Sequence, residues 1–555
     1  MPRQLLWVSI ALLVLATVGG GLLERRRAAR WRAMAANTAN AKNAQAGEIV
    51  TGAFTKALEL LDENYVTTPA RDRITQGALG GMLHALDPHS NFFDWREFGE
   101  MRNEQNSKFD GIGVTINQRN GRLYVLGVMP GMPADKAGLR YGDALLTVDG
   151  KPARDWTQSD ALKHVRGKAG TTVTITVERV GVPEPLSLDI ERAEVPFPSV
   201  RNHFMLPSDV GYVALTGGFN QTTSDELRDA LDSLKKADMR SLILDLRRNP
   251  GGLLRQAIEV SELFLPRGTE IVSVKDARAK RKHVSDNAMP ENLPLVILID
   301  GDSASASEIV AGAMQDQDRG WIVGEPSFGK GLVQTVFPLP AGTGLMLTTA
   351  KYFTASGRSI QREYGGLSFY DYYAERRGGP NHKPAAAPTG QTFFTPTHRA
   401  LHAGGGITPD KLAPATEPDY RLRDACFEFA RQLVASPRPE FATYKITQTT
   451  HGQNPRGTEF PITEEILTAF REFLRATPAW RPYEARILNQ AEAVRRRLRA
   501  ELMTAAYGVE IGERFLLEAD PQVLAALAEM AQARSLLERA RLSNASTNNA
   551  AAARQ

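Results

Sequence analysis

The stretch from Leu293 to Gln334 constrains the fold of this chain more than any other. It reads LPLVILIDGDSASASEIVAGAMQDQDRGWIVGEPSFGKGLVQ. Its first residues, 293–299, are almost entirely apolar and predict a strand that is buried on both faces. Gly301-Asp302 ends this run, and residues 307–316 then favour a helix. The stretch therefore predicts a β-α unit with a serine cluster on the turn between strand and helix.

The residues of this turn and the segment after it have the chemistry of a hydrolase. Backbone N–H groups at a helix N-terminus can stabilise a developing oxyanion. Lys330 follows between two glycines in an otherwise apolar segment, and Gln334 comes four residues later. The serines alone could be helix caps, and a single lysine is usually a surface charge. Because the two features occur together, we interpret them as a serine nucleophile with a lysine base.

Composition excludes several other classes of protein. The chain has 555 residues, enough for three or four domains with cores of their own. The formal net charge is only +4, and the basic residues are dispersed, so we expect no nucleic-acid partner. The single cysteine, Cys426, excludes a disulfide within the chain and any cysteine-based metal site. We expect neither a metal nor another cofactor.

The N-terminus carries an apolar segment, Leu5–Leu23, that contains no charge and is long enough to span a bilayer. We interpret residues 1–23 as an uncleaved signal anchor that makes a single pass through the cytoplasmic membrane, although a cleaved export signal is the alternative. Arginines follow this segment, and taken alone they favour a cytoplasmic location for the rest of the chain. Residues 24–47 read as a linker.

Helical spacing of apolar residues predicts an N-terminal helical region over residues 48–107. Residues 86–90, with the sequence LDPHS, end its first helices. We interpret His89 in this turn as structural.

Residues 108–193 change to β periodicity with glycine turns. A glycine-flanked loop (residues 111–114), the segment PADKAGL (133–139) and the segment GDALLTVDG (142–150) follow in that order. This order resembles that of a PDZ domain. The resemblance implies capture of peptide C-termini by β-augmentation. The carboxylate-binding loop then consists of Gly111, Ile112, Gly113 and Val114.

The remainder divides into an α/β core over residues 194–415, a helical region over 416–543 and a disordered tail over 544–555. Repeated strand-turn-helix units predict the core. A glycine pair, Gly251-Gly252, follows the strand SLILDL of this core and allows a ligand to approach the backbone closely. We expect the polar residues 275–292 to be a surface loop and residues 368–403 to be a surface insertion.

The motifs taken together resemble those of the carboxyl-terminal processing proteases, also called tail-specific proteases. The motifs that carry the resemblance, beside the PDZ segments, are LDPHS (86–90), DLRRNPGG (245–252), SASASEIVAGAMQD (303–316), FGKGLVQ (328–334), GRSIQ (357–361) and GITPD (406–410). The resemblance implies a protease core of crotonase-like β-α units, with an inserted PDZ domain and helical regions at both ends.

The resemblance also implies roles for single residues. Ser305 is the nucleophile, Lys330 is the general base and Gln334 orients the lysine. The oxyanion hole falls on backbone N–H groups at Gly251, Gly252 and Ala306. Arg166, at the end of the second PDZ helix, is a candidate for coupling the PDZ domain to the core.

We therefore expect a Ser-Lys endopeptidase that cuts exported proteins near unstructured C-termini, with its catalytic part in the periplasm or outside the cell. A homo-oligomer is possible. Two alternatives stay open: a PDZ adaptor on an inactive protease scaffold, and an acyl transferase or hydratase on the same crotonase-like scaffold.

Overall fold

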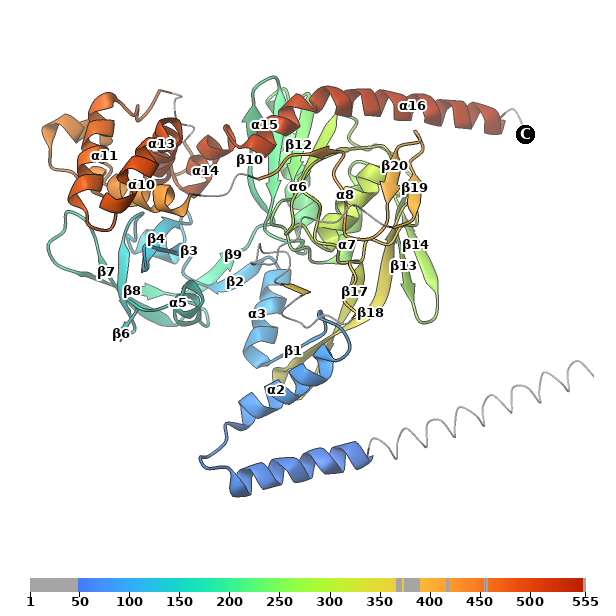
Figure 1. The fold of residues 1–555 in the computed structure, drawn as a ribbon, viewed down its shortest axis with the longest axis horizontal. Helices are drawn as coiled ribbons and strands as arrows, with labels where there is room; N and C mark the ends of the chain where they lie inside the picture. The colour runs from blue at the N-terminus through green and yellow to red at the C-terminus, as the bar shows by residue number, and fades with distance from the viewer. Residues whose placement is uncertain are drawn as a thin grey trace, which may run out of the picture. The chain divides into compact units, whose positions relative to one another are not determined.

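A computed structural model describes residues 48–365, 372–373, 390–415, 419–453, 455 and 458–552, with side chains up to residue 542 (Figure 1). The chain divides into two compact units, residues 1–82 and 83–555. The apolar segment predicted to be an anchor lies outside the described residues. Among the residues that are described, no helix is both long enough and apolar enough to cross a membrane.

A six-stranded sheet forms the centre of the larger unit. Its strand order is β10-β11-β12-β15-β16-β21, and all neighbours are parallel except the antiparallel pair β10 and β11. The strands are β10 (Val200–Leu206), β11 (Val210–Leu215), β12 (Ser241–Asp245), β15 (Leu295–Ile299), β16 (Trp321–Gly324) and β21 (Lys411–Leu412). This arrangement confirms the predicted α/β core built from β-α units.

Helices cover both faces of this sheet, which explains the uninterrupted apolar runs of β12 and β15. In β12, Leu242 and Leu244 pack into one buried cluster, whereas Ile243 points into another. The first cluster includes residues of α6 (Thr223–Lys236), α7 (Leu254–Glu262) and α8 (Ala306–Asp316). The second includes residues of α15 (Pro521–Ala528) and α16 (Met530–Ala552).

A second, antiparallel sheet lies in the same unit. Its strands are β1 (Asn91–Phe93), β13 (Glu270–Asp276), β14 (Lys280–Val284), β17 (Leu332–Pro338) and β18 (Gly344–Thr354). Strand β14 corrects the expectation that residues 275–292 form only a loop. Its sequence, KRKHV, looks like a loop because β14 is an edge strand, and lysines on an edge protect it from pairing with other chains.

The PDZ-like region forms its own six-stranded sheet around a separate core. The strands are β3 (Val114–Arg119), β4 (Arg122–Val128), β5 (Ala144–Val148), β6 (Lys151–Pro152), β7 (Thr172–Glu178) and β8 (Leu186–Glu191), and the helices are α4 (Pro133–Lys136) and α5 (Gln158–Val165). The strand pair β2 (Lys108–Gly111) and β9 (Ala193–Pro196) stands at its two chain ends.

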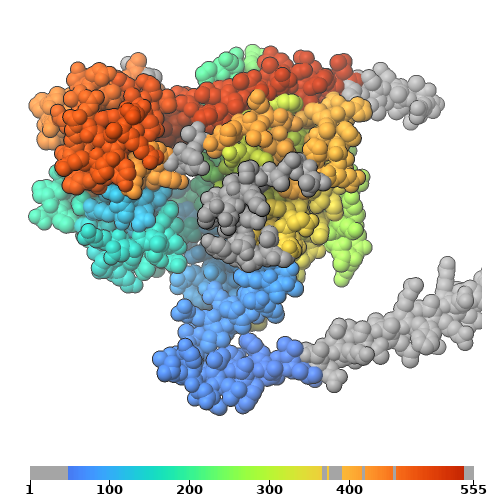
Figure 2. Space-filling model, in the orientation of Figure 1, coloured from blue at the N-terminus to red at the C-terminus, as the bar shows by residue number. Residues whose placement is uncertain are grey.

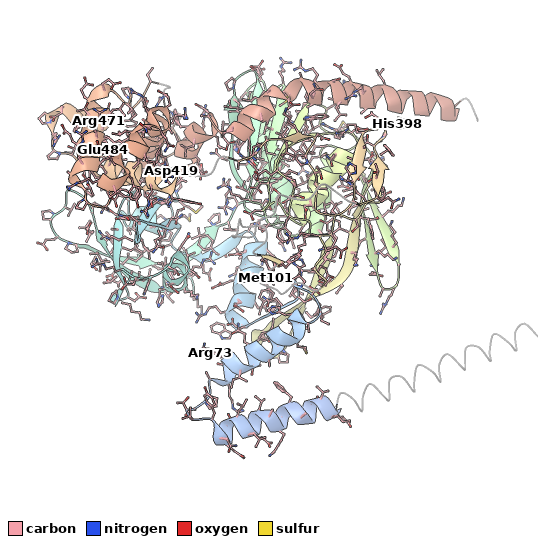
Figure 3. The ribbon with its side chains drawn as sticks, viewed as in Figure 1. Arg73, Met101, His398, Asp419, Arg471 and Glu484 are labelled. Carbon is pink, nitrogen blue, oxygen red and sulfur yellow. The ribbon has the colours of Figure 1, made fainter. Side chains whose placement is uncertain are left out.

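The C-terminal helices share a core with the PDZ-like sheet. They are α10 (Tyr420–Leu433), α11 (Glu464–Ala476), α12 (Glu484–Leu488), α13 (Ala491–Tyr507) and α14 (Val509–Leu517), and Figure 2 shows most of them in orange. Their buried cluster includes Tyr124 and Tyr141 of the PDZ-like region. Asp419, labelled in Figure 3, caps α10 and also accepts hydrogen bonds from Arg486 and Gln490.

Several elements differ from the sequence-based expectation. The smaller unit holds a helix over residues 48–64 and most of α2 (Arg71–His84), and α3 (Trp95–Gln105) follows in the larger unit. Within the predicted insertion, β19 (Thr392–Phe394) pairs with β20 (Ala400–His402). Helix α16 extends to Ala552, past residue 544, where the tail was expected to begin.

The buried ion pair between Arg358 and Asp316 supplies a test of the core. Arg358 Nη2 lies 2.8 Å from Asp316 Oδ1, and both side chains are at most 1% exposed. Arg358→Leu leaves the Asp316 carboxylate buried without its cation, which we expect to lower the free energy of unfolding by about 3–5 kcal/mol. The exposed pair Arg228–Asp225 is the matched control, and Arg228→Leu changes that free energy by less than about 1 kcal/mol. Equal losses in urea-induced unfolding of the two variants contradict this account.

Candidate active site

Ser305 lies on a strained turn between β15 and α8. It occupies the N-cap position of α8 with φ 55° and ψ −111°. A positive φ is unfavourable for a residue with a side chain, and such strain is characteristic of functional turns. The sequence-based expectation of a serine turn before a helix is thus met at Ser305.

The two neighbouring serines anchor this turn. Ser303 Oγ donates to the Leu246 carbonyl at 2.8 Å, and Ser307 Oγ donates to the Asn249 carbonyl at 2.9 Å. Both hydroxyls thereby bind the turn to the loop that follows β12. The central serine, Ser305, instead forms a capping box with Glu308 at the start of α8.

Lys330 and Gln334 lie in direct contact. Lys330 Nζ donates to Gln334 Oε1 at 2.7 Å, and Gln334 Nε2 donates to the His89 carbonyl. This second bond determines which end of the Gln334 amide faces the lysine. Gln334 therefore presents an uncharged acceptor to Lys330, and the LDPHS turn holds Gln334 in place.

The surroundings of Lys330 favour its neutral form. Burial lowers the pKa of Lys330 to about 8, although the carboxylates of Glu308 and Asp87 act in the opposite direction. Neutral lysine has a lone pair that can accept a proton. The lowered pKa therefore makes Lys330 a usable base near neutral pH.

His89 is one of the residues whose place in the site was not foreseen. Burial, together with the positive charge of Lys330, lowers the pKa of His89 to about 3. Its neutral ring lies between two hydroxyls, Tyr372 Oη at 3.1 Å from Nε2 and Tyr373 Oη at 3.0 Å from Nδ1. The side chain is thus held between the two tyrosines, and the His89 carbonyl accepts from Gln334 Nε2.

The glycine pair after β12 approaches the serine turn closely. A Cβ atom on Gly251 would lie 2.8 Å from Ser305 Cβ and 2.9 Å from the Ala306 nitrogen, and φ of Gly251 is 97°. The Gly251 N–H donates to Asn249 Oδ1 at 2.9 Å. Ala306 is the first residue of α8, so its N–H has no acceptor within the helix. The structure therefore brings Gly251 and Ala306 together beside Ser305.

An ionic network fastens the same loop to the C-terminal helices. Arg247 forms a salt bridge with Asp245 at 2.6 Å and another with Asp520 at 3.0 Å. It also donates to Gln522 Oε1 at 2.7 Å. Asp520 caps α15. The C-terminal region thus contacts the loop that carries Gly251, a link that no local sequence pattern predicts.

The predicted PDZ loop lies between β2 and β3. The carbonyls of Ile112 and Gly113 accept hydrogen bonds from Ala134 and Met129, both at 2.8 Å. Beyond the loop, Gln158 Nε2 of α5 donates to the Ile116 carbonyl of β3 at 2.9 Å. Gln158 therefore occupies a backbone acceptor of β3 in this structure.

Arg166 is placed at the boundary of the PDZ-like region. Its guanidinium lies 3.3 Å from the Glu104 carboxylate of α3 and 5.0 Å from the ring centroid of Phe109. Arg166 therefore links the PDZ-like region to α3, which lies outside the PDZ-like sheet.

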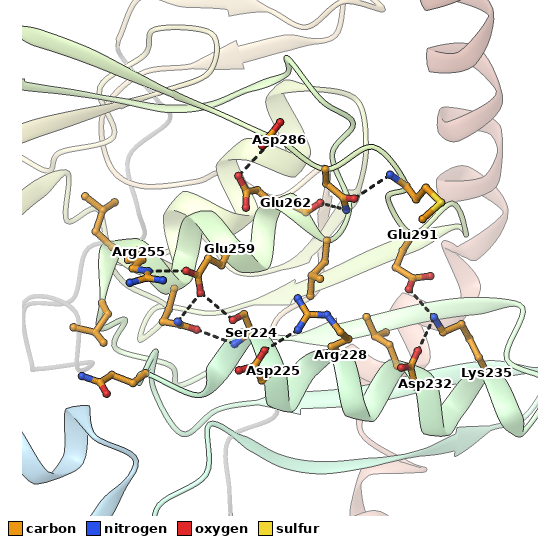
Figure 4. Close-up of a pocket in the computed structure, with 18 residues that line it drawn as sticks. Ser224, Asp225, Arg228, Asp232, Lys235, Arg255, Glu259, Glu262, Asp286 and Glu291 are labelled. Carbon is orange, nitrogen blue, oxygen red and sulfur yellow. Dashed lines mark hydrogen bonds and ion pairs between the residues drawn. The ribbon is translucent and has the colours of Figure 1, made fainter.

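A separate polar groove lies between α6 and α7 (Figure 4). It contains neither Ser305 nor Lys330. Its charged side chains pair with one another: Glu259 accepts from Arg255 and Ser224, and Lys235 contacts both Asp232 and Glu291. Because these charges are paired within the groove, we assign no ligand to it. In the part of the chain that the structure describes, no cluster of His, Cys, Asp or Glu could hold a metal ion.

Comparison with known proteins identifies the family. Residues 209–367 match the model of peptidase family S41, and residues 111–190 match that of a PDZ domain. The chain is 39% identical over 314 residues to a carboxy-terminal-processing protease of Bartonella bacilliformis, which covers 56% of this chain and 72% of the relative. The chain belongs to the carboxy-terminal processing proteases of peptidase family S41. It is therefore a PDZ-containing serine-type peptidase.

A second relative agrees with this assignment. The carboxy-terminal processing protease CtpA of Bacillus subtilis is 33% identical over 324 residues, covering 58% of this chain and 69% of the relative. Among solved structures, a photosystem II D1 C-terminal processing protease is similar with 27% identity and a TM-score of 0.34. That similarity covers 65% of this chain and 92% of the solved chain.

Gly251→Ala tests the close approach beside Ser305. The added methyl group would lie 2.7 Å from the Ala304 carbonyl oxygen, and alanine is strained at a φ of 97°. We expect the turn at Ser305 to shift and peptidase activity to fall by about 100-fold or more. Rates on an unfolded polypeptide measure the effect, and Gly268→Ala, where the added carbon has open space, is the control for φ alone. An active Gly251→Ala enzyme contradicts the expected crowding.

Proposed function

We propose that this chain is an endopeptidase with a Ser305–Lys330 dyad that cleaves polypeptides near a C-terminus captured by its PDZ domain. The observation that carries the proposal is the hydrogen bond from Lys330 to Gln334, in a site that lowers the lysine pKa to about 8. A lysine on the surface would keep an ordinary pKa and would have no use for an oriented neutral acceptor. Family membership supports the same assignment.

The proposed reaction proceeds through an acyl-enzyme. Neutral Lys330 takes the proton of the Ser305 hydroxyl while Ser305 Oγ bonds to the scissile carbonyl carbon. The tetrahedral intermediate then loses the amine, which receives the proton from Lys330, and an ester on Ser305 remains. Water attacks this ester, Lys330 removes a proton from the water, and that proton returns to Ser305 as the carboxylic acid leaves.

Backbone N–H groups beside Ser305 are proposed to stabilise the oxyanion. The Ala306 N–H is available at the start of α8, where the helix dipole adds a partial positive charge. Gly251 and Gly252 are the candidates for the second donor. Because the Gly251 N–H is engaged by Asn249 in this structure, it must leave that acceptor to take part.

Peptide capture is assigned to residues 108–193 and cleavage to residues 194–415. The loop Gly111–Val114 receives the terminal carboxylate, and the rest of the tail adds as a strand beside β3. Entry of the tail requires Gln158 to release the Ile116 carbonyl. Arg166, through Glu104, is the candidate link from the occupied PDZ domain to the core.

The location of the enzyme also belongs to the proposal. We propose that the apolar residues 5–23 anchor the chain in the cytoplasmic membrane and that the catalytic part acts on exported proteins. The support for an anchor is the length and the lack of charge of this segment.

The dyad predicts a specific pH dependence. Because only neutral Lys330 is active, kcat/KM on an unfolded polypeptide rises with pH up to about 8 and is constant above it. Ser305→Ala and Lys330→Ala each lower kcat by at least about 1000-fold. Lys275→Ala, a change of an exposed lysine on β13, is the control and leaves the rate unchanged.

Two results contradict the dyad. One is cleavage by Ser305→Ala or Lys330→Ala at the wild-type rate. The other is a rate that does not change with pH between about 6 and 8, where the lysine is expected to titrate.

Capture of the tail predicts a dependence on the terminal carboxylate. Amidation removes its charge, and losing a charge-assisted hydrogen bond raises KM about 10-fold or more with little change in kcat. A matched substrate has its free C-terminus kept and one internal glutamate replaced by glutamine. Kinetics of the full-length enzyme on the three substrates measure the effect. Equal KM values for free and amidated tails contradict PDZ capture.

A further inference from the structure

Ser305 and Lys330 come from different elements, so their spacing must be fixed by residues that contact both. Two buried side chains do so. Glu308 of α8 binds the backbone N–H groups of both residues, and Tyr352 of β18 binds the backbone carbonyls of both. Neither residue was singled out among the candidates from sequence.

The Glu308 carboxylate accepts four hydrogen bonds. Its Oε2 accepts from the N–H groups of Ser305 and Lys330, each at 2.8 Å. Its Oε1 accepts from Ser327 Oγ at 2.5 Å and from the Gly329 N–H at 2.6 Å. The side chain is fully buried. Three of the four partners are N–H groups, which can only donate. Burial raises the pKa of Glu308, and these hydrogen bonds act against that rise by stabilising the ionised carboxylate.

The Tyr352 hydroxyl lies between the two carbonyls. Its oxygen is 2.6 Å from the Lys330 carbonyl oxygen and 3.1 Å from the Ser305 carbonyl oxygen. Tyr352 is 1% exposed, and burial raises its pKa well above the ordinary value, so the hydroxyl keeps its proton. Its single proton is therefore shared between the two carbonyls, with the shorter contact to that of Lys330.

We propose that Glu308 and Tyr352 are positioning residues that together set the distance and direction between the nucleophile Ser305 and the base Lys330. The inference rests on the proposed dyad. Glu308 alone would bind only the N–H groups of Ser305 and Lys330, and Tyr352 alone would bind only their carbonyls. Together the two side chains bind both backbone groups of each residue. A loss of either bridge lets the lysine loop move relative to the serine turn.

Glu308 has a second effect, through its charge. The titratable groups that face Lys330 are Glu308 from α8, Asp87 and His89 from the 86–90 turn, and Tyr352 from β18. His89 and Tyr352 are neutral, so the charges that oppose the lowering of the Lys330 pKa are those of Glu308 and Asp87. Removing the Glu308 charge therefore lowers the pKa of Lys330 further.

Tyr352→Phe is the first test, because it removes one oxygen and keeps the ring. We expect kcat to fall by about 10- to 100-fold, as for a small misplacement of reacting groups. KM and the position of the acid limb of the pH profile stay unchanged, since no charge is altered. The control is Tyr444→Phe, which removes another buried hydroxyl bound to a backbone carbonyl, that of Pro461, in the C-terminal helical region. This control keeps the wild-type kcat.

Glu308→Gln is the second test, because it keeps the shape but replaces an acceptor by a donor. We expect a fall in kcat of about 100-fold and a shift of the acid limb of kcat/KM to lower pH. A purely structural role would lower the rate without moving the limb. Glu226→Gln is the control, since the Glu226 carboxylate also accepts from two backbone N–H groups, those of Ser199 and Val200. It leaves the limb in place.

The outcomes separate the two proposals. Wild-type kcat in Tyr352→Phe or in Glu308→Gln overturns the positioning role of the residue changed. An unmoved acid limb in Glu308→Gln overturns the effect of the Glu308 charge on Lys330. Inactive Ser305→Ala and Lys330→Ala enzymes in the same assay show that the dyad itself holds. Full activity of those two variants contradicts the proposed function instead.

Discussion

The loss of water around Lys330 is the interaction on which the rest of the site depends. Burial removes the hydration that stabilises a charged ammonium group, so the pKa of the group falls. Two carboxylates nearby oppose this fall, yet each is already engaged. Glu308 accepts four hydrogen bonds, and Asp87 accepts from the N–H groups of His89 and Ser90 and from the Ser90 hydroxyl. Their negative charges act on Lys330 through space. The opposing effects of burial and of these two charges set the pKa of Lys330 at about 8.

The fold brings this environment together from distant parts of the chain. The parallel sheet places the loop after β12 and the turn after β15 at the same edge, which joins the glycine pair to Ser305. The antiparallel sheet supplies Gln334 from β17 and Tyr352 from β18, and its strand β1 follows directly after the turn that holds Gln334. The N-terminus of α15 reaches the same edge through the salt bridge between Arg247 and Asp520. The site is therefore a junction of two sheets.

Local patterns in the sequence predicted the parts of this site that are close in the chain. The apolar run before Ser305 and the glycines around Lys330 required only neighbouring residues to interpret. Glu308 was missed although Ser305-x-x-Glu308 has the spacing of a capping box. Tyr352, Tyr372 and the His89 carbonyl act across the fold, and no local pattern marks such contacts. Strand β14 was missed because its charged edge reads like a loop.

Titration of Lys330 itself tests the central claim most directly. Lysines methylated with ¹³C in the full-length Ser305→Ala protein can be followed by NMR as the pH is raised, and Lys330→Met identifies the signal. The account predicts that the Lys330 signal titrates near pH 8. A midpoint at or above the ordinary lysine value of about 10.4 would contradict it, since a lysine that stays protonated cannot be the base.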